Sequence, residues 1–205
     1  MLRAYNTNHL ILGDTSRYAD NPTTKGDWLG VAFKQGDGRN VFDDIVMGAT
    51  WGAWVHCELV IARNTTGKAY AAFQGGLGFM PSPSEPSPPG WAMFALPVTD
   101  PAAVKAHALS LLALELPYNY GDLWQCWMSA MLPWETELDC ARPESWKTTG
   151  VFCSQVALLF IRQMSRQQAV VLPSDTQALV EATHSRGCSP NMLFELLSRS
   201  CLRVF

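Results

Sequence analysis

The stretch VFCSQVALL, residues 151–159, decides the fold of this chain. Nearly every position from Val156 to Ile161 is apolar, which is typical of a helix that is buried on all sides. We expect this helix to begin at Cys153, with the sulfur at the positive end of the helix macrodipole. That position favours the nucleophilic thiolate, and the nearby backbone N–H groups could stabilise an oxyanion. In the alternative interpretation Cys153 is only a small buried hydrophobe.

A strand expected from Val55 to Ala62 carries a second candidate group, the imidazole of His56. We expect this strand to form a β-hairpin with the apolar run at residues 68–74. Because side chains alternate along a strand, His56 and Glu58 should lie on one face and Cys57 on the other. The sequence therefore predicts a carboxylate beside the imidazole, with Cys57 pointing away from both.

An imidazole in an apolar strand is costly to bury unless it has a partner. His56 is therefore either a core histidine that binds a backbone carbonyl or a base that lies next to a thiol. Glu58 could orient the imidazole, stabilise the imidazolium, or pair with a cation and do neither. A buried glutamate is rarer than a buried histidine, which favours a pairing between the two side chains.

The composition is typical of a single domain that spans residues 1–205. The chain is 48% hydrophobic and 16% charged, and its 15 basic residues are scattered and nearly balanced by 18 acidic ones. This argues against a nucleic-acid partner. No terminal apolar stretch approaches the roughly 18 residues of a membrane span, and the start of the chain lacks the features of a signal peptide. We therefore expect a cytoplasmic or virion-associated protein without an integral membrane segment.

The six cysteines are expected to be free thiols, because the chain shows no secretory signal. There is no Cys-x-x-Cys motif, and the four histidines are far apart in the sequence. We therefore expect no metal site and no cofactor.

The rest of the pattern predicts short strands and helices around these two elements. Residues 1–25 should wrap the surface, and residues 81–90, of which five are proline, should form a stiff connector. Further strands are expected at 28–33 and 91–96. Helices are expected at 41–47, ended by Gly48; at 101–116, capped by Asp100; in a short piece that ends at Met131; at about 175–184, capped by Ser174 and Asp175; and at about 190–199, capped by Ser189.

Five motifs occur in a fixed order along residues 28–197. They are the strand with His56 and Glu58, the hairpin that follows it, LPYNYG at 116–121, FCSQ at 152–155 and SPNML at 189–193. In this order they resemble the permuted NlpC/P60 superfamily of papain-like cysteine hydrolases, and the YiiX-like branch in particular. The resemblance implies an α+β, circularly permuted papain-like fold, with an antiparallel sheet packed on a central helix that begins at Cys153. It also implies that Cys153 is the nucleophile and His56 the general base.

Two positions depart from the family pattern. Gln155 stands where the family often has glutamate. The third polar residue, which usually lies on the strand after the histidine, falls here in the largely apolar run AYAAF at residues 69–73. Glu58, Gln74 and the Tyr70 hydroxyl are the candidates to orient His56, and Glu58 is preferred.

The function implied by this resemblance is hydrolysis of an amide bond through an acyl-thioester on Cys153. The substrate would be a peptide, an isopeptide or a cell-wall-type linkage, selected by loops at residues 81–90 and 133–150. A lipid acyl hydrolase or acyltransferase of the lecithin retinol acyltransferase type is the alternative chemistry, since such proteins share the order of histidine and cysteine. A structural component of a virion or large assembly that has lost activity is the non-enzymatic alternative. The sequence does not specify an oligomeric state.

Overall fold

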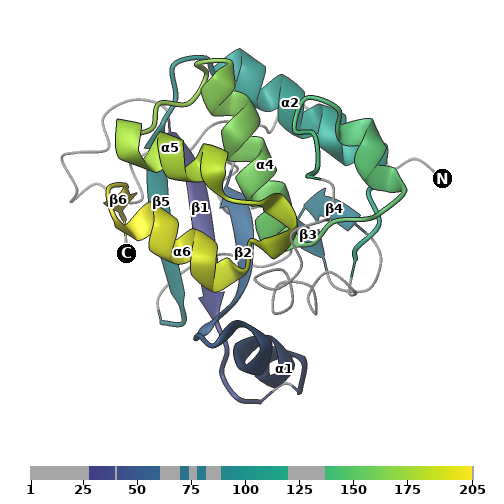
Figure 1. Ribbon diagram of the computed structural model, residues 1–205, viewed down its shortest axis with the longest axis vertical. Coiled ribbons are helices and arrows are strands. Elements are labelled where there is room, and N and C mark those ends of the chain that lie inside the picture. The colour runs from purple at the N-terminus through teal and green to yellow at the C-terminus, as the bar shows by residue number, and fades with distance from the viewer. Residues whose placement is uncertain are drawn as a thin grey trace.

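A six-stranded antiparallel sheet forms the base of the protein (Figure 1). The computed structural model describes residues 28–39, 41–60, 70–73, 78–81, 89–119 and 137–204. The strand order is β4-β3-β2-β1-β5-β6. Their bounds are β1 Trp28–Gln35, β2 Trp54–Val60, β3 Tyr70–Phe73, β4 Gly78–Pro81, β5 Trp91–Pro97 and β6 Leu202–Arg203.

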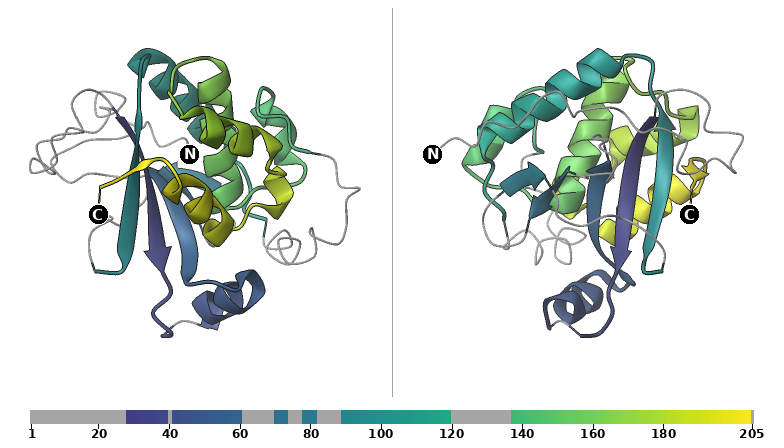
Figure 2. Two further views of the ribbon diagram at one scale, coloured as in Figure 1. Left: turned by 60° about the vertical axis from the view of Figure 1, so that its left-hand side comes forward. Right: turned by 180° about the vertical axis from the view of Figure 1, so that it is seen from behind.

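Helices pack against one face of this sheet, which makes the described part of the chain α+β. The α-helices are α1 Val41–Thr50, α2 Pro101–Leu114, α4 Cys153–Arg166, α5 Ser174–Ala182 and α6 Pro190–Ser198, and the 3₁₀ turns are η3 Pro143–Lys147 and η4 Ser185–Gly187. Figure 2 shows α2, α4, α5 and α6 together on one side of the sheet, whereas α1 lies apart beyond the ends of β1 and β2. None of the helices within the described ranges is long and apolar enough to cross a membrane.

Alternation along the central strands divides the apolar side chains between the two faces of the sheet. Val31 of β1, Leu59 of β2 and Phe94 of β5 belong to the large core that faces the helices. Their neighbours Ala32, Val60 and Met93 belong to a smaller cluster on the other face. The alternation predicted for the strand with His56 is therefore confirmed.

Helix α4 runs through the large core. All ten residues from Cys153 to Arg162 are buried, as the apolar run predicts. Burial of each large apolar side chain stabilises the fold by roughly 1.5–3 kcal/mol. A shift of this helix would expose several of these side chains at once and lose their contributions to stability. The position of Cys153 is consequently fixed by the core rather than by a surface loop.

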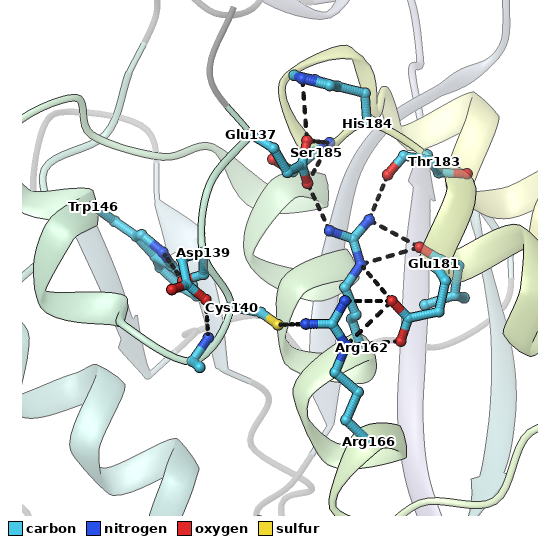
Figure 3. A network of polar contacts seen from close by, with 12 residues as sticks. Glu137, Asp139, Cys140, Trp146, Arg162, Arg166, Glu181, Thr183, His184 and Ser185 are labelled. Atoms are coloured by element: carbon cyan, nitrogen blue, oxygen red, sulfur yellow. Dashed lines mark hydrogen bonds and ion pairs between the residues drawn. The ribbon is translucent and has the colours of Figure 1, made fainter.

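The far end of α4 is tied to α5 by the buried guanidinium of Arg162 (Figure 3). Its Nε and Nη2 donate to the carbonyl of Val180 at 3.1 and 2.9 Å, and Nη2 also donates to the carbonyl of Thr183. These carbonyls lie at the end of α5, where no helical N–H remains to pair with them. Nη1 donates to Glu137 Oε1 at 2.6 Å, and Glu137 also accepts from the backbone N–H of Ser185. Arg162 therefore caps α5 and joins three segments.

Several predicted helix boundaries were wrong. Helix α1 passes through Gly48 and ends at Thr50, because the left-handed residue that follows the helix is Trp51, with φ 53°. Helix α2 ends at Leu114 rather than 116, because Glu115 is left-handed. Ser174 is the first residue of α5 and not its cap. The caps of Asp100 and Ser189 were predicted correctly, since their side chains accept from Ala103 N and Met192 N.

The buried side of α2 carries a titratable group, His107. Its ring lies against Phe160 of α4, with the centroids 5.0 Å apart. Among the described residues, none hydrogen-bonds its buried Nε2. Burial lowers the pKa of His107 from 6.5 to about 4.

We expect the folded protein to lose stability as the pH falls from about 6.5 toward 4, because the unfolded chain binds a proton at His107 that the folded chain resists. A His107→Leu variant should show a smaller loss than the wild type, by up to roughly 2 kcal/mol at about pH 4.5. Urea unfolding near pH 4.5 and near pH 7 measures the difference. The same pH dependence in both proteins would contradict this role of His107.

Candidate active site

Strand β2 holds His56 and Glu58 side by side. The strand is paired with β1 in a register that sets Lys34 opposite His56 and Ala32 opposite Glu58. His56 Nε2 lies 3.3 Å from Glu58 Oε1. The side chain of Glu58 is only 1% exposed, whereas that of His56 is 22% exposed. The carboxylate thus approaches the imidazole from the inside and leaves part of the ring open to solvent.

Cys153 is the first residue of α4, as expected from the sequence. The backbone of Phe152 is extended and forms the N-cap, and its N–H donates to Gln155 Oε1 at 3.1 Å. Phe152 and Gln155 are both completely buried. The amide of Gln155 therefore satisfies one backbone donor at the helix start without placing a charge next to the thiol.

The segment before Cys153 is held by the LPYNYG motif. Val151 N donates to the Pro117 carbonyl at 2.9 Å, and Asn119 N donates to the Val151 carbonyl at 3.0 Å. Gly150 has φ +70°, and a Cβ there would lie 2.9 Å from the Pro117 carbonyl oxygen. Only glycine fits this close approach, so the chain enters α4 along one fixed path.

Cys153 contacts β2 through two neighbouring residues. Side-chain hydrogen bonds join it to both His56 and Cys57, and the backbone N–H of Cys57 also donates to its sulfur. Because a backbone N–H of a strand lies in the plane of the sheet, a sulfur that accepts from the N–H of Cys57 sits at an edge of β2. A sulfur at this edge can be reached from both faces of the strand.

The pKa values of Cys153 and His56 are shifted in the directions that favour an ion pair between them. Hydrogen bonds from Cys57 and the charge of His56 outweigh burial and hold the pKa of Cys153 well below its ordinary value of 9.0. Burial alone would lower the pKa of His56, but Cys153 and Glu58 overcome it and raise this pKa to about 10. Both shifts favour the ion pair of a thiolate and an imidazolium over the neutral pair of a thiol and an imidazole.

The structure brings the three predicted site residues together. Glu58 contacts His56, and His56 contacts Cys153. Of the other candidates for the third polar residue, Gln74 and the side chain of Tyr70 lie outside the described residues. Most of the connector at 81–90 and the start of the loop at 133–150 also lie outside them. Within the described ranges, no group of three or more His, Cys, Asp or Glu side chains is arranged to hold a metal ion.

Cys57 is the site residue that sequence analysis missed. It does point away from Glu58, as alternation predicts, but it points into the core that contains Cys153. Burial and the proximity of Cys153 raise the pKa of Cys57 and keep it a thiol. Its position next to His56 in the sequence was the only available signal, and it becomes meaningful only once α4 is placed.

The SPNML motif fixes the start of β2. Asn191, in the first turn of α6, accepts from Trp54 N and donates to the Trp54 carbonyl, both at 2.9 Å. Its amide also donates to Thr50 Oγ1 at 2.6 Å. The side chain thus pairs with β2 as a neighbouring strand would, two residues before His56.

We expect a Gln155→Ala variant to be less stable than the wild type by about 1–3 kcal/mol, because it leaves the buried Phe152 N–H without its acceptor. A Gln155→Glu variant keeps an acceptor in the same place and should retain most of the stability at neutral pH. Thermal unfolding of the two variants measures the difference. Equal destabilisation by both changes would show that the hydrogen bond is not what matters at this position.

The chain matches no protein-family model, and no curated protein or solved structure matches it at a significant level. The reaction class must therefore be inferred from the geometry of the site.

Proposed function

We propose that this protein is a cysteine hydrolase in which Cys153 is the nucleophile and His56 the general base and acid. The observation that carries the proposal is the contact between a cysteine at the start of a buried helix and an imidazole that is itself bound by a buried carboxylate. These are the parts that thiol catalysis needs: a nucleophile, a proton carrier and a group that orients the carrier.

In the proposed reaction the Cys153 thiolate attacks the carbonyl carbon of the substrate. The imidazolium of His56 then gives its proton to the leaving group, and an acyl-thioester remains on Cys153. A water molecule, deprotonated by the now neutral His56, attacks the thioester and releases the acid. Glu58, at 3.3 Å from Nε2, stabilises the charged ring and fixes its orientation, so that Nδ1 is the nitrogen that exchanges the proton with the sulfur.

The start of α4 can stabilise the negative charge that develops on the substrate's carbonyl oxygen. The first N–H groups of an α-helix lack partners within the helix and point toward its N-terminal end. The N–H of Phe152 is engaged by Gln155, so those of Cys153 and Ser154 are the candidates to donate to the oxyanion. Preorganised donors of this kind act strongly where water is excluded.

The reaction class is acyl transfer to a thiol followed by hydrolysis, with an amide of a peptide, isopeptide or cell-wall-type linkage as the proposed substrate. The contact between Glu58 and His56 supports activity over an inactive scaffold, because Glu58 supplies a carboxylate that can orient the imidazole. A lipid ester would use the same residues in the same roles, so it is the alternative substrate.

We expect iodoacetamide to label Cys153 faster than the other cysteines near pH 6.5, with a rate that changes little up to about pH 9. In a His56→Ala variant the rate at pH 6.5 should fall by about tenfold or more, because the thiolate fraction falls tenfold for each unit by which the pKa of Cys153 rises. The loss should shrink at higher pH. Peptide mapping by mass spectrometry measures labelling at each cysteine.

A His184→Ala variant is the matched control for this experiment, since His184 is a half-exposed histidine that pairs with Glu137 at the other end of α4. It should label like the wild type. If Cys153 labels no faster than the other cysteines and the His56→Ala change does not slow it, the proposed nucleophile and base are wrong.

A further inference from the structure

Cys153 has a second thiol directly beside it. Cys57 and Cys153 are both free, and the two residues are 1% and 3% exposed. Both belong to the same buried core, where α4 packs on β2, and the Cys57 thiol is close enough to hydrogen-bond to the Cys153 sulfur. The proposed hydrolysis needs only one nucleophilic sulfur, and a hydroxyl would serve equally well as a donor to it. A thiol at this position therefore allows a chemistry that the hydrolase mechanism leaves unused.

We propose that Cys57 and Cys153 form a redox-active dithiol, in which Cys57 captures oxidised Cys153 as a disulfide and so closes and protects the nucleophile. This regulation acts on the site described above and rests on the proposed function, because it takes Cys153 as the reactive thiolate. The oxidant is a peroxide, which is small enough to reach a sulfur that is nearly buried.

The two sulfurs differ as the two members of such a pair must. Cys153 is held as a thiolate by its hydrogen bonds and by His56, whereas burial keeps Cys57 protonated. The thiolate is the form that peroxides oxidise, so the first step occurs at Cys153 and not at Cys57. The thiol that is not oxidised remains available for the second step.

The steps balance without a further reactant. The Cys153 thiolate attacks one oxygen of hydrogen peroxide and the O–O bond breaks. Sulfenic acid forms at Cys153, and the departing hydroxide takes the proton of the His56 imidazolium and leaves as water. The Cys57 sulfur then attacks the Cys153 sulfur, the S–O bond breaks, and the oxygen leaves as a second water that takes up the proton lost by Cys57. In total the two cysteines lose two electrons, and hydrogen peroxide gains them and is reduced to water.

The fold keeps the two sulfurs together. Helix α4 packs across β2, and its start is fixed by Gln155 on one side and by residues 117–119 on the other. Cys188 is also buried nearby, but its thiol faces the carbonyl of Ser189, with Sγ 3.9 Å from that oxygen. Cys57 is therefore the partner that the structure favours for Cys153.

The test treats the reduced full-length protein with a small excess of hydrogen peroxide, blocks the remaining thiols and maps disulfides by mass spectrometry. We expect a Cys57–Cys153 disulfide that dithiothreitol reverses. In a Cys57→Ser variant, Cys153 should instead proceed to sulfinic acid, and the fraction recovered as thiol after reduction should fall about tenfold or more. A Cys201→Ser variant, which removes a half-buried thiol elsewhere, should behave like the wild type.

Two results would overturn the proposal: a disulfide that joins Cys153 to Cys188, or recovery of Cys153 that is the same in the wild type and in the Cys57→Ser variant. The wild-type mapping needs no variant, and Cys57→Ala offers a second substitution if Cys57→Ser fails to fold. Disulfide mapping uses no substrate, and all the proteins compared in it keep His56. The disulfide can therefore fail to form while Cys153 still labels rapidly in the labelling experiment, so failure of this proposal is distinguishable from failure of the proposed function.

Discussion

The contact between the start of α4 and the edge of β2 is the interaction on which the site depends. Cys153 meets His56 and Cys57 at one point because α4 lies across β2 and because the backbone N–H of Cys57 donates to the Cys153 sulfur. The thiolate is then stabilised by a backbone N–H, a thiol and an imidazolium. Each of these groups is held by hydrogen bonds or by burial in the core, so little reorganisation is needed when charge moves onto or off the sulfur.

The elements around this contact come from distant parts of the sequence. Asn191 of α6 fixes the start of β2, and Pro117 and Asn119 fix the chain just before Cys153. Arg162 anchors the far end of α4 through the carbonyls at the end of α5. A substitution at any of these positions can therefore displace the sulfur or the imidazole without touching either of them, because packed helices and strands transmit small shifts.

The sequence predicted the central elements because local physics determines them. The uninterrupted apolar run after Cys153 indicates a buried helix, and alternation places Glu58 beside His56. The contacts with Cys57 and Asn191 could not be predicted, since they depend on how α4 and α6 sit on the sheet and no local pattern encodes that arrangement. Helix ends were wrong where a left-handed residue other than glycine, such as Trp51 or Glu115, ends the helix. The short strands β4 and β6 carry too few residues for a periodicity to show.

The ion pair between Cys153 and His56 is the central claim, and titration of the His56 imidazole by NMR tests it most directly. In the wild type the ring should remain protonated above about pH 8, because Cys153 and Glu58 raise its pKa to about 10. In a Cys153→Ala variant the thiolate is gone and burial opposes protonation, so the pKa should fall clearly below the wild-type value. The same pKa in both proteins, or a neutral ring at pH 7 in the wild type, would contradict this account.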